Sequence, residues 1–129
     1  MLLGKNRRQF LKSYDNLSQV LTDKQLAALG DAYINFVYSL ALSGRRKTPC
    51  GKKVKGTPLA EAIRKVELRR MLPSRIDKHV LSDAAEALLV FAWLNDFITL
   101  EESVEALEKN DDLEQGLICL LQKAKKIRI

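Results

Sequence analysis

The stretch Leu29-Gly30-Asp31-Ala32 lies within an apolar run that extends over Leu26–Leu42. An acid in such a run is costly, because an unpaired carboxylate in a dry interior loses several kcal/mol or shifts its pKa and becomes neutral. Glycine inside a helix also costs about 1 kcal/mol relative to alanine. Two unfavourable residues side by side indicate a function. We expect another backbone to approach Gly30 closely and Asp31 to have a charge partner.

A second apolar segment, Ser82-Asp83-Ala84-Ala85-Glu86-Ala87-Leu88-Leu89, also contains acids. Asp83 and Glu86 are three residues apart, so a helix places both carboxylates on one face. The sequence therefore predicts that Asp31, Asp83 and Glu86 meet around a metal ion. A structural alternative stays open, in which Asp83 and Glu86 form a capping box and Asp31 pairs with a buried Arg or Lys.

Length and composition are those of an ordinary globular protein. The chain has 129 residues, of which 47% are hydrophobic and 29% charged, so we expect a single domain over residues 1–129. The net charge of +6 favours polyanionic partners. Residues 44–55 carry six Lys or Arg and no acid, whereas residues 96–114 are mainly acidic. This uneven charge indicates a directed contact rather than general adhesion.

We expect no targeting or anchoring segment. The first residues lack the apolar core of a signal peptide, and the apolar run Ala87–Leu94 is far too short to span a membrane, so no membrane partner is expected. Cys50 and Cys119 have no metal-binding spacing and are too few for a disulfide scaffold. We therefore expect an intracellular, reduced setting, which is the cytoplasm.

The apolar pattern predicts an all-α protein, a multi-helix bundle. Pro, Gly and β-branched residues are sparse, and apolar positions recur at helical spacing. Apolar residues cover most of the predicted helix 23–42, which places it at the centre. The expected helices, in chain order, span residues 5–14, 23–42, 57–70, 82–94, 99–109 and 111–126, with one or two further turns over 17–21.

Local capping patterns set these bounds. The predicted starts are the pairs Thr22 with Gln25, Thr99 with Glu102 and Asp111 with Glu114, together with Thr57-Pro58. Ser43-Gly44 ends the second helix. The basic segment 44–55, which contains Pro49, Gly51 and Gly56 at its end, is then expected to be a mobile loop.

Three segments, taken in order, resemble the catalytic domain of the ribonuclease III family. Leu29-Gly30-Asp31-Ala32 resembles the core of its signature helix, and Leu59-Ala60-Glu61-Ala62 through Glu67-Leu68 resembles the helix that follows. Ser82-Asp83-Ala84-Ala85-Glu86-Ala87-Leu88 is similar to its Ala-Asp-x-x-Glu-Ala-hydrophobic motif. The resemblance covers about residues 22–95. It implies a compact ribonuclease III-like domain without a double-stranded-RNA-binding domain, similar to Mini-ribonuclease III.

The resemblance implies an enzyme, a homodimeric endonuclease that hydrolyses phosphodiester bonds in double-stranded or structured RNA with Mg²⁺ or Mn²⁺. Carried over to this chain, Asp31 and Glu86 would be metal ligands, and Asp83 would help to hold the metal and its waters. Magnesium prefers oxygen ligands and keeps several waters, which suits carboxylates converging from two helices. No other cofactor is expected.

A nuclease also needs cations that hold the backbone of its substrate. In this chain the candidate RNA contacts lie in the basic segment and are Arg45, Arg46, Lys52 and Lys53.

The sequence departs from the family pattern at three positions. An acid is expected four residues before Asp31, where this chain has Ala27, and another three residues further upstream, where it has Lys24. The bulky residue of the family's dimer contact is Ala28 here. One metal ligand is therefore missing, and the dimer is expected to pack differently at its centre.

Two rival interpretations remain open at this stage. The first is a non-catalytic RNA-binding or ribosome-associated module on the same fold. The second sets the resemblance aside and leaves a small basic helical protein that binds nucleic acid through residues 44–55.

Overall fold

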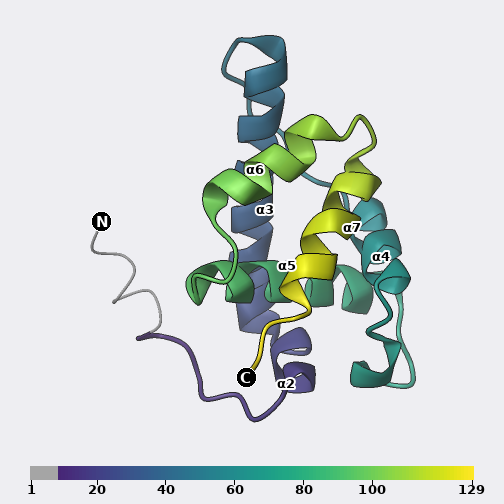
Figure 1. Cartoon of the computed structure of the whole chain (residues 1–129). Coiled ribbons are helices and arrows are strands. Elements are labelled where there is room, and N and C mark those ends of the chain that lie inside the picture. The colour runs from purple at the N-terminus through teal and green to yellow at the C-terminus, as the bar shows by residue number, and fades with distance from the viewer. Residues whose placement is uncertain (1–8) are drawn as a thin grey trace.

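The structure, a computed structural model, describes residues 9–129 and is all-helical over that range, as predicted (Figure 1). Six α-helices and one short 3-10 helix follow one another in the order α2 (Leu17–Leu21), α3 (Lys24–Arg46), α4 (Gly56–Lys65), η1 (Arg69–Met71), α5 (Lys78–Leu94), α6 (Leu100–Lys109) and α7 (Leu113–Ala124).

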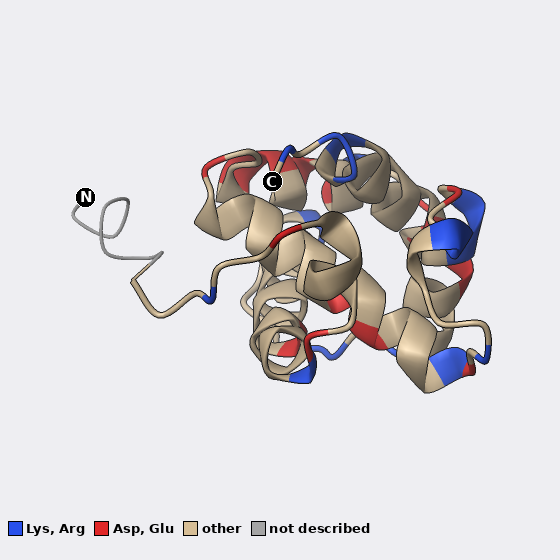
Figure 2. Cartoon of the chain, turned by 90° about the horizontal axis from the view of Figure 1, so that it is seen from below, with Lys and Arg blue, Asp and Glu red and all other residues tan. Residues whose placement is uncertain are grey.

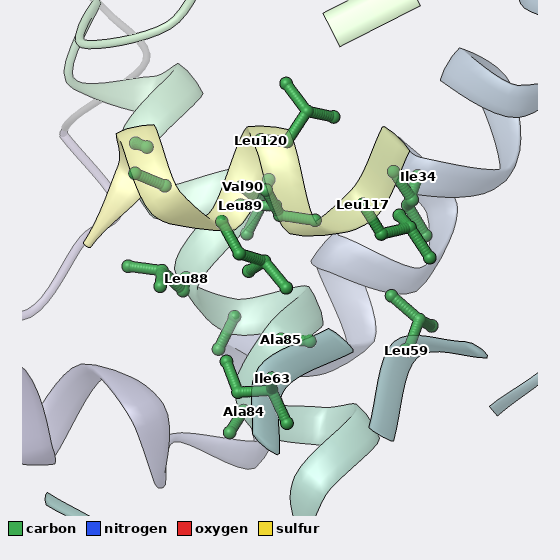
Figure 3. Packing of buried hydrophobic residues seen from close by; sticks show 14 of the residues in the cluster. Ile34, Leu59, Ile63, Ala84, Ala85, Leu88, Leu89, Val90, Leu117 and Leu120 are labelled. Carbon is green, nitrogen blue, oxygen red and sulfur yellow. The ribbon is translucent and has the colours of Figure 1, made fainter. Parts of the chain in front are cut away.

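The most buried helix is α5, and α2, α3, α4 and α7 pack against it, whereas α6 packs on α3 and α7 (Figure 1). Every residue from Ala84 to Ala92 is buried, and Glu86 is the one charged residue among them. A helix that is apolar all round belongs in the core. Figure 3 shows α5 side chains such as Leu89 and Val90 in one cluster with Leu120 of α7 and Ile63 of α4. The prediction that helix 23–42 is the central one was therefore wrong.

Helix α3 crosses α5 at unusually close range. A Cβ atom added at Gly30 would lie 2.0 Å from the backbone oxygen of Glu86, so the position has room only for glycine. This confirms the expectation that another backbone approaches Gly30. The contact brings the residue after Gly30, which is Asp31, to the level of Glu86 on α5.

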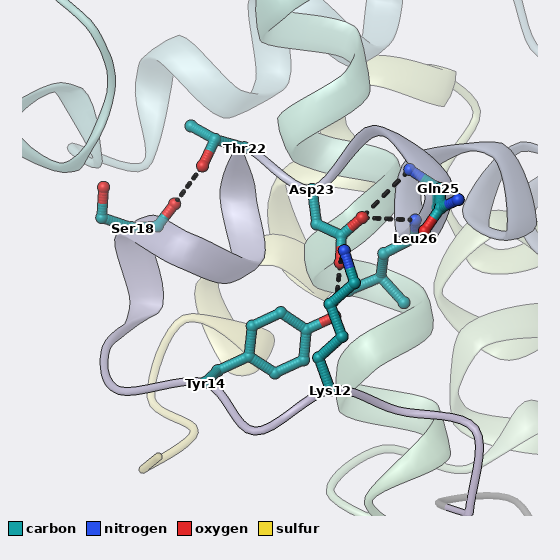
Figure 4. Close-up of polar contacts among 7 residues, drawn as sticks. All are labelled: Lys12, Tyr14, Ser18, Thr22, Asp23, Gln25 and Leu26. Carbon is teal, nitrogen blue, oxygen red and sulfur yellow. Dashed lines mark hydrogen bonds and ion pairs between the residues drawn. The ribbon is translucent and has the colours of Figure 1, made fainter.

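Helix α3 begins and ends at other residues than predicted. Its N-cap is Asp23, whose Oδ1 accepts the backbone N–H groups of Gln25 and Leu26 at 3.0 and 3.1 Å (Figure 4). Thr22 instead ends α2, and its hydroxyl donates to the carbonyl oxygen of Ser18. The helix continues to Arg46 because only the next residue, Lys47, adopts the left-handed conformation that stops it (φ 57°).

Residues 9–14, which precede α2, form a turn and irregular chain rather than a helix. Of the predicted helix 5–14, residues 5–8 lie outside the described residues, and residues 9–14 form no helix. The Tyr14 hydroxyl donates to Asp23 Oδ2 at 2.6 Å, and Lys12 lies 3.9 Å from the same oxygen (Figure 4). Burial raises the pKa of Asp23, but the hydrogen bonds from Tyr14 and Leu26 outweigh it and lower that pKa overall. Phe10, an apolar residue of this segment, is 63% exposed.

Helices α4 and α5 also differ from the predicted bounds. Lys55, not Thr57, is the N-cap of α4, and the helix stops at Lys65 because the chain turns at Val66 and Glu67, which has a positive φ of 62°. Helix α5 begins one turn earlier than predicted, at Lys78, because the Asp77 side chain caps it through the N–H of Val80.

The C-terminal helices follow the prediction more closely. The capping box of Thr99 and Glu102 is confirmed at the start of α6. Asp112, rather than Asp111, is the N-cap of α7, which ends at Ala124.

By length and composition alone, α3 is long and apolar enough to cross a membrane. It also packs along α5 and α6, and core helices of this kind meet the same criteria.

Replacing Gly30 with alanine should lower the free energy of unfolding by at least about 3 kcal/mol, because its Cβ would have to push two helix backbones apart. Urea unfolding followed by circular dichroism measures this. The matched control is Gly51→Ala, where nothing lies within 4 Å of the added atom and φ is not positive. We expect that control to stay within about 0.5 kcal/mol of the wild type. Equal stability of the two variants would contradict the close contact.

Candidate functional site

The acids identified in the sequence come together where α3 crosses α5. Glu86 lies in the middle of α5 and is 7% exposed, whereas Asp31 is on the solvent side of α3. The Asp31 carboxyl group lies close enough to Glu86 to raise the pKa of that residue through hydrogen bonding and charge. Asp83 is half-buried one turn before Glu86 and close enough for its charge to act on that residue. The site is therefore a carboxyl pair with a third acid beside it.

The capping alternative for Asp83 and Glu86 is wrong, because α5 begins at Lys78 and both acids lie inside the helix. The alternative of a basic partner for Asp31 finds no support either. None of the ion pairs between residues 9 and 129 involves Asp31, Asp83 or Glu86.

The environment of Glu86 favours its protonated form. Burial, the hydrogen bond with Asp31, and the negative charges of Asp31 and Asp83 together raise the pKa of Glu86 to about 8. A buried acid with two acidic neighbours carries a proton that a cation could replace. The pair thus has the character of an incomplete cation site.

A metal ion would have to be held with few protein ligands. In the part of the chain that the structure describes, no group of three or more His, Cys, Asp or Glu side chains is arranged to hold one ion. Hard oxygen donors from Asp31 and Glu86 nevertheless suit Mg²⁺, which commonly binds through one or two carboxylates and keeps several waters. Asp83 can then act through such a water.

Two of the three departures from the family pattern, Ala27 and Lys24, concern this site. Ala27 is buried and supplies no ligand. Lys24 and Asp83 line one pocket of about 110 Å³, together with residues such as Pro73 and Val80. The chain thus places a cationic side chain where the resemblance led us to expect a further acid.

A row of polar side chains continues from Asp31 along α3. Asn35, Ser39 and Ser43 follow at four-residue spacing, which places them on one side of the helix. The Asn35 amide donates to Asp31 Oδ1 at 3.3 Å and accepts the backbone N–H of Val54 at 2.7 Å. Sequence reasoning missed this row. Its signal was polar residues recurring every fourth position in an otherwise apolar helix.

The end of the basic segment lies along this polar row. The Ser39 hydroxyl accepts the N–H of Lys52 at 2.9 Å and donates to its carbonyl oxygen at 3.1 Å. The Ser43 hydroxyl accepts the N–H of Cys50 at 3.0 Å. Residues 50–54 are therefore tied to α3, contrary to the expectation of a mobile loop.

The four candidate RNA contacts fall into two groups. Arg45 and Arg46 belong to the last turn of α3, not to a loop. The Arg45 guanidinium donates to the carbonyl oxygens of Leu107 and Glu108 at 3.0 and 2.8 Å, and so satisfies the exposed carbonyl end of α6. Arg45 thus has a structural role. Arg46, Lys52 and Lys53 are exposed and form no ion pair with another described residue.

Charged residues are unevenly distributed over the part of the chain that the structure describes. In Figure 2, basic residues are prominent at the right of the view and acidic residues at its upper left.

Comparison with known proteins supports the resemblance drawn from the sequence. The ribonuclease III family model matches residues 24–127, which extends from the start of α3 to beyond the end of α7. A search of curated proteins returns no match.

Without divalent cations, the free energy of unfolding should fall as the pH rises from about 5 to 8. Folded Glu86 holds a proton up to a pKa of about 8, whereas a glutamate in the unfolded chain has its ordinary pKa of 4.5, so deprotonation favours unfolding in this window. Glu86→Gln cannot ionise and should be more stable than the wild type at pH 8, on the order of 3 kcal/mol. The difference should shrink towards pH 5.

Urea titrations in EDTA at several pH values test this, with Glu105→Gln as the control. Glu105 is an exposed acid on α6 that pairs with Lys109, so its substitution should leave the pH dependence intact. Parallel pH profiles for the wild type and Glu86→Gln would contradict the assigned environment of Glu86.

Proposed function

The chain belongs to the ribonuclease III family, and we propose that it is a metal-dependent endoribonuclease acting on double-stranded or structured RNA. Family membership supports a ribonuclease-type function. The observation that carries the finer proposal is the contact between Asp31 and the buried Glu86, with Asp83 beside them and no basic partner among the described residues. We place the activity in the cytoplasm, in keeping with two free cysteines.

Asp31 and Glu86 are the proposed ligands of one Mg²⁺ or Mn²⁺ ion. When bound, such an ion acidifies a water molecule and offsets the charge that develops on the phosphate. Glu86 supplies a carboxylate fixed by the core, and Asp31, on the solvent side of α3, leaves the pair open to a large substrate. Asp83 adds negative charge that favours a cation over the shared proton.

A single ion fits this chain better than two. Ala27 offers no oxygen, and Lys24 brings a positive charge into the pocket that Asp83 lines. A lysine there opposes a second cation through like-charge repulsion. It can also attract a phosphate of the substrate.

We propose Arg46, Lys52 and Lys53 as contacts to the RNA backbone, and leave out Arg45 because α6 engages it. The tethered segment 50–54 lies on the polar row that begins with Asp31, so the backbone that carries its lysines is held along the same side of α3. Phosphate contacts of this kind position a substrate and weaken with salt.

We further propose that two copies associate through the outer face of α3. Leu29 and Phe36 are 40% and 54% exposed, and Ala28 and Ala32 lie on the same side of the helix. Contiguous exposed apolar residues indicate an interaction surface. The small Ala28 would let the two α3 helices approach closely at the centre of a homodimer.

The alternative function is a non-catalytic RNA-binding or ribosome-associated module. Two observations favour it: no three-residue ligand group occurs among residues 9–129, and Lys24 stands in the pocket beside Asp83. Such a module would bind duplex RNA without cutting it.

The cleavage of long duplex RNA in Mg²⁺ tests the enzyme. Wild-type protein should cut, and Asp31→Asn and Glu86→Gln should each lower the rate on the order of 100-fold or more, because each removes a charged ligand of the ion. Glu105→Gln is again the matched control and should cut normally. Duplex binding without cutting, unchanged in both site variants, would favour the non-catalytic module instead.

The dimer is tested by sedimentation equilibrium. Phe36→Glu should convert a dimer to a monomer, because it would bury a carboxylate at the interface. A cost of about 3 kcal/mol for burying that charge weakens association more than 100-fold. Met71→Glu is the control. Met71 has the same exposed fraction as Leu29 (40%), but it belongs to η1 and not to the outer face of α3. An unchanged mass for Phe36→Glu, or a monomeric wild type, would rule out this interface.

A further inference from the structure

Asn35 forms hydrogen bonds with both Asp31 of the acidic pair and Val54 of the basic segment. Its Nδ2 donates to Asp31 Oδ1 at 3.3 Å, and its Oδ1 accepts the N–H of Val54 at 2.7 Å. Both polar ends of the amide are therefore used, one by the candidate site and one by the segment that carries Lys52 and Lys53.

The next two residues of the polar row, Ser39 and Ser43, also bind the segment, and the three contacts follow a regular spacing along both elements. Positions 35, 39 and 43 of α3 pair with positions 54, 52 and 50 of the segment. Four helical residues rise about 6 Å, and two extended residues span about 6.6 Å, so every fourth helix residue meets every second segment residue. The segment thus runs antiparallel to α3, and Asn35 is the last contact before Asp31.

We propose that Asn35 is a positioning residue that joins the basic segment 50–54 to the acidic pair, so that the carboxylate of Asp31 and the lysines of the segment move as one unit. What this unit does rests on the proposed function: it would hold the RNA backbone at a fixed distance from the carboxylates. By linkage, whatever orders one part of the unit favours the ordered form of the other.

Three variants of the full chain separate the two contacts of Asn35. Asn35→Leu has a similar shape and removes both. Asn35→Asp keeps an oxygen that accepts the Val54 N–H but loses the donor to Asp31. Ser39→Ala removes the adjacent contact to Lys52 and leaves Asn35 intact. Asn35 and Ser39 are only half-buried, so all three variants should fold, which their Tm values check.

The first measurement is the rate of trypsin cleavage after Lys52 or Lys53 in metal-free buffer, with the products identified by mass. Asn35→Leu and Ser39→Ala should be cut about five- to tenfold faster than the wild type, because each loses hydrogen bonds that hold the segment closed. Asn35→Asp should be cut at nearly the wild-type rate. Equal rates for the wild type and Asn35→Leu would overturn the inference, whatever the RNA assay gives.

The second measurement is the steady-state cleavage of duplex RNA. Ser39→Ala should raise KM with little change in kcat, because it loosens only the lysines. Asn35→Leu should raise KM and also lower kcat, because Asp31 loses its donor as well. A loss of kcat that is equal in both variants would overturn the link to Asp31. A wild type that cuts no RNA would count against the proposed function alone, and faster tryptic cutting of Asn35→Leu would still support the anchoring role.

Discussion

The structure depends on the crossing of α3 and α5, where Gly30 lies directly against the backbone oxygen of Glu86. Without a side chain at Gly30 the two helix axes can approach closely, and the apolar faces on either side of the crossing then close into one core. The same approach sets Asp31 beside the Glu86 carboxyl group. Core packing and the candidate site therefore both depend on this one contact.

This arrangement costs stability at the site. Glu86 is the one charged residue within the buried part of α5, and burial together with two acidic neighbours holds its pKa near 8. A core helix without a functional site would carry an apolar residue at position 86. Proteins depart from the rule that buried positions are apolar mainly at functional sites. A cation that replaced the proton of Glu86 would compensate the negative charge of the buried carboxylate.

Helix α3 has three faces with different partners. Residues such as Ile34 and Val37 face the core, the polar row from Asp31 to Ser43 holds the basic segment, and Phe36 is exposed. Because apolar residues occupy two of the three faces, the sequence pattern looked like that of a fully buried helix. Periodicity reports which residues are apolar, but not whether a face meets the core or is left for a partner.

By itself, the sequence determined the helical class, the capping box of α6, the close approach at Gly30 and the family, because each depends on local spacing or on a short ordered pattern. Which of several adjacent capping residues is used was decided by tertiary contacts, as when Tyr14 and Lys12 reach Asp23. The same holds for the role of Arg45 at the end of α6 and for Asn35, whose partner Val54 is distant in sequence. These contacts join segments whose proximity exists only once the helices have packed.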